Sequence, residues 1–484
     1  MNNIMDQYKF INEIIQSSDE LIQNFILDNI FSIVTPHDSF VSNGFFNYYN
    51  YNKIDFCKQN RENNTNVSQK KYFRKGFKFL KKYFSNGFFE KPDCFHRNSI
   101  FLIYVPNEKY KDIGLILYNR IKNEFDWQPI IIYYSSEMLF DKNYEQINLK
   151  YSFVNPIKMF GLFKKITILK KKIGKEDKHL KFKYFLFKNL WKNQIHNLMI
   201  YEGFKKLFTN ISCEGVFSCV PTTNFSRIMN LVAKNYKIPT FSIRRGITFH
   251  NVENYFIETD YLFAKGDYEK KIYLDCNLNK KMTLEKVGIP YMKSYTDTYD
   301  NNKNILFVDQ PISNACSAEN KENIIKLLAK YFKKISNIKL IIKIHPGTKL
   351  NIYESIFNKY KINKEKYEIY GHENNIEKIL RRTDYVFMHN STVGFNALLQ
   401  GKELIIFDDM FFGKETNNIF LNKNIAHIID KEEKLKTILD KISNNEFNRK
   451  KTYEIKKFLK YHFEAYNEDA FNNILSFIKT RPNI

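Results

Sequence analysis

Short apolar runs alternate with helical stretches along much of this sequence, and this rhythm limits the possible fold more than any other feature. In one place SIFLIYV (residues 99–105) is followed by a helical stretch (residues 113–125) and then by PIIIYY (residues 129–134). Apolar runs of this length are typical of strands that are buried on both faces of a sheet. A strand, a helix and a second strand make a βαβ unit, so the sequence predicts parallel sheets covered by helices.

The same rhythm continues in two successive series, which predict two Rossmann-like, doubly wound α/β domains. In the first series the later predicted strands are residues 215–220, 239–243 and 261–266, with a helix at residues 224–236. In the second series the predicted strands are residues 304–309, 339–346, 367–371, 384–390 and 403–409, and the helices are residues 318–335, 376–382 and 392–400. Two such domains define a cleft, and ligands bind beyond the carboxyl ends of the strands.

The 484 residues of the chain leave room for two or three domains. We expect a mainly helical N-terminal extension, a first Rossmann-like domain with a basic insertion near residues 160–195, a second Rossmann-like domain, and C-terminal helices that cross back to the first domain. The polar segment at residues 294–304 reads as the linker between the two domains. The expected bounds of the four parts are residues 1–95, 96–293, 304–450 and 451–484.

The chain carries 76 Lys and Arg residues against 52 Asp and Glu residues, a net charge of +24. Such a balance favours polyanionic partners. Lysines alternate with apolar residues at residues 70–82 and 164–192, which suits a helix on an anionic membrane surface, although a solvated basic face gives the same pattern. No helix-turn-helix, zinc-finger or RNP-like motif is visible, so a nucleic-acid-binding protein is a weaker alternative and we expect no nucleic-acid partner.

Cysteine usage and the N-terminus both point to the cytoplasm. The six cysteines are scattered without a CxxC pair or zinc-like histidine spacing, which predicts free thiols in a reducing compartment. The sequence shows no signal peptide and no run of about 18 apolar residues. We therefore expect a cytoplasmic protein that is either soluble or peripheral on the inner face of the cytoplasmic membrane.

Polar residues follow three predicted strands of the second series, where the strand-end rule expects a ligand. These residues are Asp309, Gln310, His345, Pro346, Asn390, Ser391 and Thr392. The most specific stretch is KIHPG (residues 343–347), because a buried strand delivers His345 to the rim before the chain turns away. An imidazole there could bind a phosphate or protonate it as it leaves. Alternatively, His345 is a hydrogen-bonded residue that ends a strand.

The segment NSTVGFNALLQGK (residues 390–402) predicts a second anion site. Ser391 is a good N-cap, and the free N–H groups at a helix start, with the helix dipole, attract anions. Hydroxyl groups and backbone amides together suit a nucleotide phosphate. An ordinary capped helix in a βαβ unit has the same sequence pattern, so this segment does not decide the matter alone.

The two motifs together resemble the paired HP and S motifs of bacterial capsule-type glycosyltransferases. Lys-x-His-Pro is followed about 45 residues later by Ser-Thr-x-Gly-Phe-x-Ala-Leu-x-x-Gly-Lys. That group includes the β-Kdo transferases, the bacterial sialyl- and polysialyltransferases and, more distantly, the polyol-phosphate polymerases. The resemblance implies a GT-B fold with an acceptor domain followed by a nucleotide-sugar donor domain, and a donor that carries CMP or CDP. It implies that His345 contacts or protonates the donor phosphate and that Ser391 and Thr392 hold it.

Eight residues make up the donor site that we expect: Gln310, Lys343, His345, Pro346, Gly347, Asn390, Ser391 and Thr392. The general base is unassigned, because Arg244 and Arg245 stand where relatives usually have an acidic residue or Gln-His, and Asn396 stands where relatives often have glutamate. The candidates for the base are Glu214, Glu253, Asp260 and, more remotely, Glu108. The two arginines could instead clamp a phosphate or a carboxylated sugar.

We expect no cofactor and no obligatory metal, since Asp408-Asp409 does not form a DxD motif. The predicted function is transfer of a sugar (Kdo, sialic-acid-like or related) from a CMP-activated donor to a growing surface polysaccharide or lipid-linked glycan. The alternatives are a CDP-polyol phosphotransferase, another GT-B enzyme such as a sugar-nucleotide 2-epimerase, and an inactive GT-B scaffold. The expected partners are a nucleotide-sugar donor, a glycan or glycolipid acceptor and the anionic membrane surface.

Overall fold

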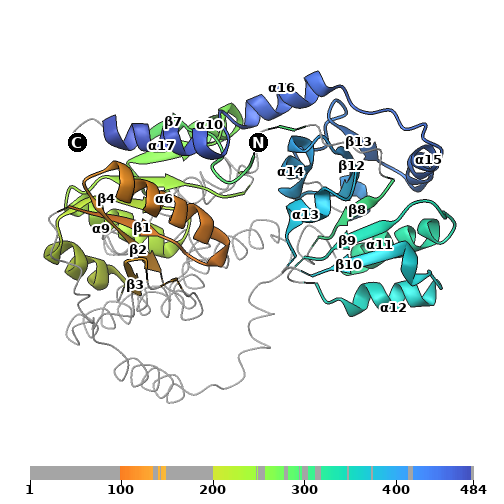
Figure 1. Cartoon of the computed structure of the whole chain (residues 1–484), viewed down its shortest axis with the longest axis horizontal. Helices are drawn as coiled ribbons and strands as arrows, with labels where there is room; N and C mark the ends of the chain where they lie inside the picture. The colour runs from red at the N-terminus through yellow and green to blue at the C-terminus, as the bar shows by residue number, and fades with distance from the viewer. Residues whose placement is uncertain are drawn as a thin grey trace, which may run out of the picture. The chain divides into compact units, whose positions relative to one another are not determined.

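The computed structural model of the chain divides into two compact units (Figure 1). It describes residues 99–133, 140–141, 143–148, 200–246, 248, 257–276, 282–293, 295–296, 303–310, 318–345, 348–371, 374–412 and 418–480. Unit 1 holds the described residues up to Ala264, together with Glu269–Val287 and those from Phe471 onward, and unit 2 holds Lys265–Tyr268 and Gly288–Ala470. The predicted N-terminal extension and both basic stretches, at residues 70–82 and 164–192, lie outside the described residues.

Unit 1 contains a parallel sheet whose strands follow the order β3-β2-β1-β4-β5-β6-β7 (Figure 1). In its centre Leu102 of β1 is paired with Ile130 of β2 and with Val216 of β4. Every residue of β1 is buried, as expected for a parallel strand with helices on both faces. The strands are β1 (Ile100–Tyr104), β2 (Gln128–Tyr133), β3 (Gln146–Asn148), β4 (Cys213–Ser218), β5 (Thr240–Ile243), β6 (Tyr261–Ala264) and β7 (Thr283–Lys286).

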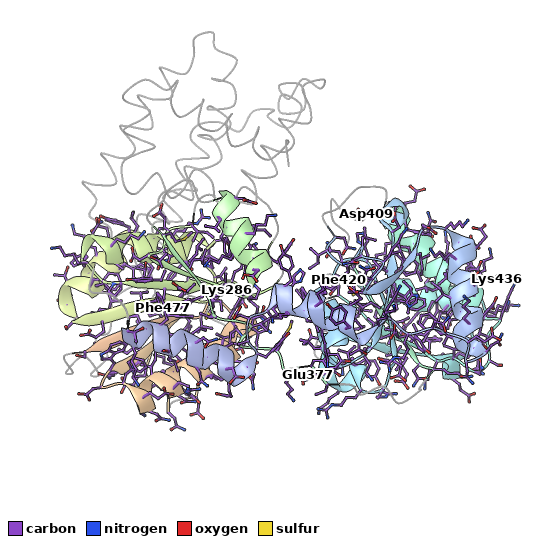
Figure 2. The ribbon with its side chains drawn as sticks, turned by 90° about the horizontal axis from the view of Figure 1, so that it is seen from above. Lys286, Glu377, Asp409, Phe420, Lys436 and Phe477 are labelled. Carbon is purple, nitrogen blue, oxygen red and sulfur yellow. The ribbon has the colours of Figure 1, made fainter. Side chains whose placement is uncertain are left out.

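Helices pack against this sheet through apolar and aromatic side chains. The C-terminal helix does so with Phe477, whose ring meets those of Tyr261 and Phe263 edge-on at centroid distances of 5.2 and 5.6 Å (Figure 2). The helical elements are η1 (Glu108–Tyr110), α6 (Lys111–Glu124), α9 (Asn224–Asn235), α10 (Asp267–Cys276) and α17 (Asn467–Thr480), of which α10 belongs to unit 1 from Glu269 onward and α17 from Phe471 onward.

Unit 2 contains a second parallel sheet, with the strand order β10-β9-β8-β11-β12-β13. Its strands are β8 (Ile305–Val308), β9 (Leu340–Lys343), β10 (Tyr367–Tyr370), β11 (Tyr385–Met388), β12 (Glu403–Phe407) and β13 (Ala426–Ile429). Its helical elements are α11 (Ala318–Phe332), α12 (Asn351–Lys359), η3 (Lys364–Lys366), α13 (Ile376–Leu380), α14 (Val393–Leu399), η4 (Asp409–Phe412), α15 (Glu432–Ser443) and α16 (Thr452–His462).

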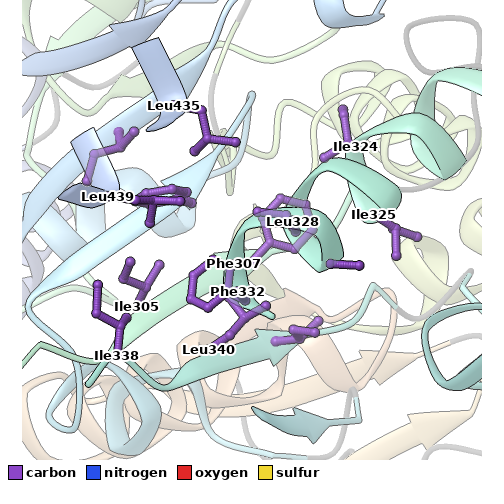
Figure 3. Packing of buried hydrophobic residues seen from close by; sticks show 14 of the residues in the cluster. Ile305, Phe307, Ile324, Ile325, Leu328, Phe332, Ile338, Leu340, Leu435 and Leu439 are labelled. Atoms are coloured by element: carbon purple, nitrogen blue, oxygen red, sulfur yellow. The ribbon is translucent and has the colours of Figure 1, made fainter. Parts of the chain in front are cut away.

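The apolar core of unit 2 forms because α11 places one face on the sheet. Ile324, Leu328 and Phe332 recur at intervals of four residues and are all buried, so they form one stripe along the helix. Figure 3 shows this stripe beside Ile305 and Phe307 of β8. Full burial of each such side chain contributes about 1.5–3 kcal/mol, and this packing holds β8 in the middle of the sheet.

Both sheets have a topological switch point, where the strand order reverses. It lies between β1 and β4 in unit 1 and between β8 and β11 in unit 2. In open sheets of this type ligands bind outside the carboxyl ends of the strands at the switch point. The prediction of two doubly wound α/β domains is confirmed.

Several outer elements were not predicted from the sequence. Among them are three strands at the sheet edges: β3 (QIN), β7 (TLEK) and β13 (AHII). Such strands are short or partly exposed, so they lack the continuous apolar run that marks a central strand. None of the helices in the described parts of the chain is both long and apolar enough to cross a bilayer.

A buried ion pair joins the amino ends of two central strands of unit 2. Lys402 Nζ lies 3.0 Å from Asp384 Oδ1, and neither side chain is more than 1% exposed. Asp384 precedes β11 and Lys402 precedes β12, so the pair ties the starts of neighbouring strands together.

Replacing Lys402 with Met should leave the Asp384 carboxylate buried without its cation. We expect a loss of about 3–5 kcal/mol, which corresponds to a fall of roughly 10 °C in the melting temperature. The matched control is Lys326→Met, because Lys326 forms an exposed pair with Glu322 and its loss should matter little. Equal melting temperatures for the two variants would contradict this account.

Candidate functional site

The three predicted strand ends of unit 2 lie at one edge of the sheet, on adjacent strands. Asp309 directly follows β8, His345 follows β9 by two residues, and His389 directly follows β11. In the sheet, β8 lies between β9 and β11, so these ends are neighbours at the switch point. A small cavity of ≈10 Å³ lies here, about the size of one water molecule. Its lining is Phe307, Val308, Asp309, Gln310, Lys321, Ile324, Ile325, Tyr353 and His389.

The carboxylate of Asp309 connects the ends of β8 and β9. Asp309 Oδ2 accepts a hydrogen bond of 3.0 Å from the backbone N–H of His345, and Oδ1 accepts one of 2.6 Å from the Tyr353 hydroxyl. The Lys321 ammonium lies 2.8 Å from Oδ1 and 3.0 Å from Oδ2. Sequence reasoning placed Asp309 on the rim but did not reveal this network, which involves residues distant in the sequence.

Lys321 is buried in the first turn of α11 and reaches both strand ends. Besides Asp309, its ammonium donates to the backbone oxygen of Gln310 at 2.7 Å and to the Thr348 hydroxyl. The backbone N–H of Thr348 in turn donates to the carbonyl of His345 at 2.8 Å. Lys321 therefore links Gln310 to Thr348, which is hydrogen-bonded to the carbonyl of His345.

His345 itself is exposed at this edge, in contrast to the buried network beneath it. Its backbone is fixed by Asp309, whereas its imidazole lies where a ligand can reach it. Lys343 is half-buried, and its ammonium donates to the backbone oxygen of Gly371, so it connects β9 to the end of β10. Pro346 and Gly347 lie outside the described residues.

His389 is a site residue that the sequence did not single out. It is 3% exposed, and its Nε2 lies 2.7 Å from Asp409 Oδ1, just after β12. The Asn418 side-chain amide donates to the His389 carbonyl at 2.7 Å. Burial lowers the pKa of His389, and the hydrogen bond with Asp409 offsets this only in part, so the imidazole is neutral at pH 7. The sequence signal was a polar pair, His389-Asn390, at the end of an apolar strand.

The start of α14 differs from the prediction. The helix spans only seven residues, and its N-cap is Thr392, with helical backbone angles and no side-chain cap hydrogen bond, rather than Ser391. Ser391 Oγ accepts a hydrogen bond of 3.3 Å from the N–H of Val393. Asn390 and Ser391 are half-buried and Thr392 is exposed, so all three still line the carboxyl edge next to His389. The helix ends at Leu399 with Gln400 as its C-cap, and the next residue, Gly401, has a φ of +67° that favours glycine.

In unit 1 two arginines lie at the corresponding edge. Arg244 directly follows β5, and both Arg244 and Arg245 are half-exposed. The Arg245 guanidinium lies 5.8 Å from the ring centre of Tyr110. Burial raises the pKa of Tyr110, and the charges of Arg245 and Arg244 oppose that rise. Burial likewise raises the pKa of the Cys219 thiol to about 12, which keeps this thiol protonated. The edge is thus cationic near the switch point of unit 1.

Two of the candidates for the general base, Glu214 and Asp260, lie at the other edge of this sheet. Glu214 is the second residue of β4, and Asp260 directly precedes β6, so both are at the amino ends of strands. Asp260 Oδ2 accepts hydrogen bonds from the backbone N–H and the hydroxyl of Thr240, at 3.0 and 2.8 Å. These positions do not support either residue as the base, because ligands bind at the carboxyl edge. Glu253 lies outside the described residues.

Two carboxylates lie at the carboxyl edge of unit 1 instead. Glu108 is exposed after β1, with Lys111 Nζ 3.4 Å away. Glu269 on α10 is 2% exposed and accepts hydrogen bonds from Thr248 and, at 3.1 Å, from the Tyr273 hydroxyl. Burial and the Glu269 carboxylate raise the pKa of Tyr273 well above its ordinary value. No sequence pattern marked Glu269, because it lies within a helix and its partner Thr248 is 21 residues away.

Within the described parts of the chain, no group of three or more His, Cys, Asp or Glu residues is placed to hold a metal ion. Cys213 and Cys219 are not joined in a disulfide, and Cys213 Sγ donates to the backbone oxygen of Gly215 at 3.4 Å. That the reaction needs no metal ion stays a prediction.

Residues 301–415 match the family of capsule polysaccharide biosynthesis proteins. The match covers β8 to the end of β12, which includes Gln310, His345 and the Asn390–Thr392 segment. It confirms the predicted resemblance to the glycosyltransferases of bacterial capsule synthesis and the prediction of an enzyme of polysaccharide biosynthesis. No related protein was found among curated sequences.

Several solved structures resemble the chain at low sequence identity. The lipopolysaccharide outer core galactosyltransferase WaaB is 11% identical, with a TM-score of 0.49 over 79% of this chain and 100% of that chain. A putative UDP-N-acetylglucosamine 2-epimerase from Listeria monocytogenes is 11% identical, with a TM-score of 0.48 over 79% and 96% of the two chains. MurG from Acinetobacter baumannii is 10% identical, with a TM-score of 0.44 over 79% and 99%. Similarities of this size say nothing about donor or acceptor.

The lowered pKa of His389 predicts a pH-dependent contribution to stability. Its ordinary pKa of 6.5 applies to the unfolded chain, which therefore takes up a proton at higher pH than the folded chain does. The neutral imidazole stabilises the fold fully above about pH 6.5, and this stability is lost as the pH falls below that value. Between about pH 7.5 and about pH 5.5 the melting temperature of the parent should fall more than that of His389→Asn. Parallel pH profiles would contradict a buried neutral His389.

Proposed function

We propose that this protein is a glycosyltransferase that moves a sugar from a CMP-activated donor to a growing bacterial surface polysaccharide or lipid-linked glycan. One observation carries the proposal: His345 and the Asn390–Thr392 segment, which resemble the HP and S motifs, lie at the ends of strands that flank β8, at the switch point of unit 2. Ligands bind at this place in sheets of this type. The family match of residues 301–415 supports polysaccharide synthesis.

In this proposal the donor phosphate lies against the carboxyl edge of unit 2. The exposed imidazole of His345 faces it from the end of β9, and polar groups of Gln310, Ser391 and Thr392 contact it from the ends of β8 and β11. The bond between the anomeric carbon and the phosphate oxygen breaks, and CMP leaves with the bonding electrons. His345 hydrogen-bonds or protonates the departing phosphate, which stabilises the charge that develops on it.

The acceptor hydroxyl attacks the anomeric carbon and gives its proton to a base that we leave unassigned. Glu108 and Glu269 are two carboxylates at the carboxyl edge of unit 1. Arg244 and Arg245 act at the same edge as a clamp for an anionic group, either a phosphate or a sugar carboxylate, since a guanidinium binds both bidentately. No metal or cofactor takes part in this proposal, and the protein works in the cytoplasm at the inner face of the membrane.

A CMP donor should stabilise the folded protein against heating. A ligand that binds only the folded state adds about 2.7 kcal/mol at ~100 times its dissociation constant. We expect CMP or a CMP-sugar to raise the melting temperature more than UDP or GDP species do at the same concentration, as measured by calorimetry. A larger shift with UDP would contradict the cytidine donor.

Replacing His345 with Ala should lower kcat by roughly 100- to 10,000-fold, because the proton or hydrogen bond that it supplies matters most in the transition state. Ser391→Ala should mainly raise the KM of the donor, since its hydroxyl contacts the phosphate in the ground state too. The matched control is His427→Ala, which removes an imidazole from the middle of β13, away from the carboxyl edge.

Steady-state kinetics with a verified donor tests both expectations, after circular dichroism shows that each variant is folded. A folded His345→Ala with the turnover of the parent would mean that the histidine only ends a strand. The transfer mechanism proposed here would then be wrong.

A further inference from the structure

We propose that Lys321, Asp309 and Tyr353 form a clasp that positions His345 and Gln310 for transfer, and that the clasp has no direct contact with the substrate. The inference rests on the proposed function, because it assigns these residues to the same site. Their role would be that of positioning residues: they act through the backbone of the residues that meet the donor. Neither the sequence motifs nor the family match assigns them a role.

The N–H donors of the Lys321 ammonium match in number the residues around it. An ammonium group has three N–H donors, and here it meets three residues: Asp309, the backbone oxygen of Gln310 and the Thr348 hydroxyl. The side chain is only 5% exposed. A buried lysine that is held in three directions at once fixes the geometry of what it touches.

Both oxygens of the Asp309 carboxylate accept hydrogen bonds from groups of the protein. It accepts hydrogen bonds from the His345 backbone, the Tyr353 hydroxyl and Lys321, and it is 1% exposed. A carboxylate in this state is neither a general base for an acceptor nor a ligand for a metal ion. What it does is fix the peptide group of His345 relative to β8.

The residues of the clasp come from separate parts of unit 2. Lys321 is on α11, Tyr353 is on α12 and Asp309 follows β8, and through Asp309 they are joined to the backbone of His345. Catalytic groups must be held to within a fraction of an ångström, and a displacement of about 1 Å can lower a rate by about 100-fold. The His345 side chain is exposed, and the clasp holds the backbone N–H of the same residue through Asp309.

A second buried Lys–Asp pair in the same sheet provides a matched control. Lys402 and Asp384 are 3.0 Å apart and as deeply buried as Lys321 and Asp309, but they precede β12 and β11 and so lie at the amino edge. Replacing both members of a buried ion pair with apolar residues of similar size is often close to neutral for stability. The double variants Asp309→Leu/Lys321→Met and Asp384→Leu/Lys402→Met therefore make equivalent changes at opposite edges of one sheet.

The experiment measures donor kinetics and backbone hydrogen exchange on the full-length chain. For Asp309→Leu/Lys321→Met we expect kcat to fall by about 100-fold, with a smaller change in the KM of the donor, and faster amide exchange in the peptide that contains His345. The amino-edge double variant should keep the kcat of the parent and the exchange rate of that peptide. Tyr353→Phe, which removes one hydrogen bond to Asp309, should fold if the double variant does not, and should lower kcat several-fold.

The outcomes separate the two proposals. A parent that transfers no sugar from any CMP donor overturns the proposed function and, with it, the role of the clasp in transfer. An active parent with unchanged kcat in the clasp variants overturns this inference alone, as does an equal loss of kcat in the amino-edge control. Unchanged exchange at His345 in the folded clasp variants would show that Asp309 does not hold this turn, whatever the enzyme transfers.

Discussion

Parallel strands that are buried on both faces leave only their ends for polar side chains. In unit 2 the strands β8, β11 and β12 are apolar along their central residues, and the charged groups gather at the two edges of the sheet. At the amino edge Asp384 and Lys402 pair with each other, and at the carboxyl edge Asp309 and Lys321 do the same. The carboxyl edge differs because Asp309 also holds the backbone N–H of His345, one of the site residues predicted from the sequence.

The same constraint explains which parts of the site the sequence could predict. Lys343, His345 and Ser391 stand out because each lies near the end of an apolar run, and the end of a parallel strand is where ligands bind. Their partners do not stand out in this way. Asp309 meets the backbone of a residue 36 positions away and Lys321 meets a carboxylate 12 positions away, and only the sheet order brings them together.

Other differences arose from local chemistry that the sequence does not decide. Ser391 and Thr392 are both suitable N-cap residues. In the structure Thr392 is the N-cap of α14, and Ser391 Oγ accepts a hydrogen bond from the backbone N–H of Val393. Glu214 and Asp260 lie near predicted strands, and the exact bounds of each strand decide at which end these residues lie. In the structure Glu214 is the second residue of β4 and Asp260 directly precedes β6, so both lie at amino ends. Glu269 had no sequence pattern at all, and its burial and its hydrogen bonds with Thr248 and Tyr273 are seen only in the fold.

We propose that the carboxyl edge of β8, β9 and β11 binds the phosphate of a cytidine nucleotide. The measurement that tests it most directly is a crystal structure of the full chain with CMP bound. The account predicts that the phosphate lies within hydrogen-bond distance of the His345 imidazole and of groups in the Asn390–Thr392 segment, above the Asp309–Lys321 pair. A nucleotide bound elsewhere, with His345 turned away from its phosphate, would contradict it.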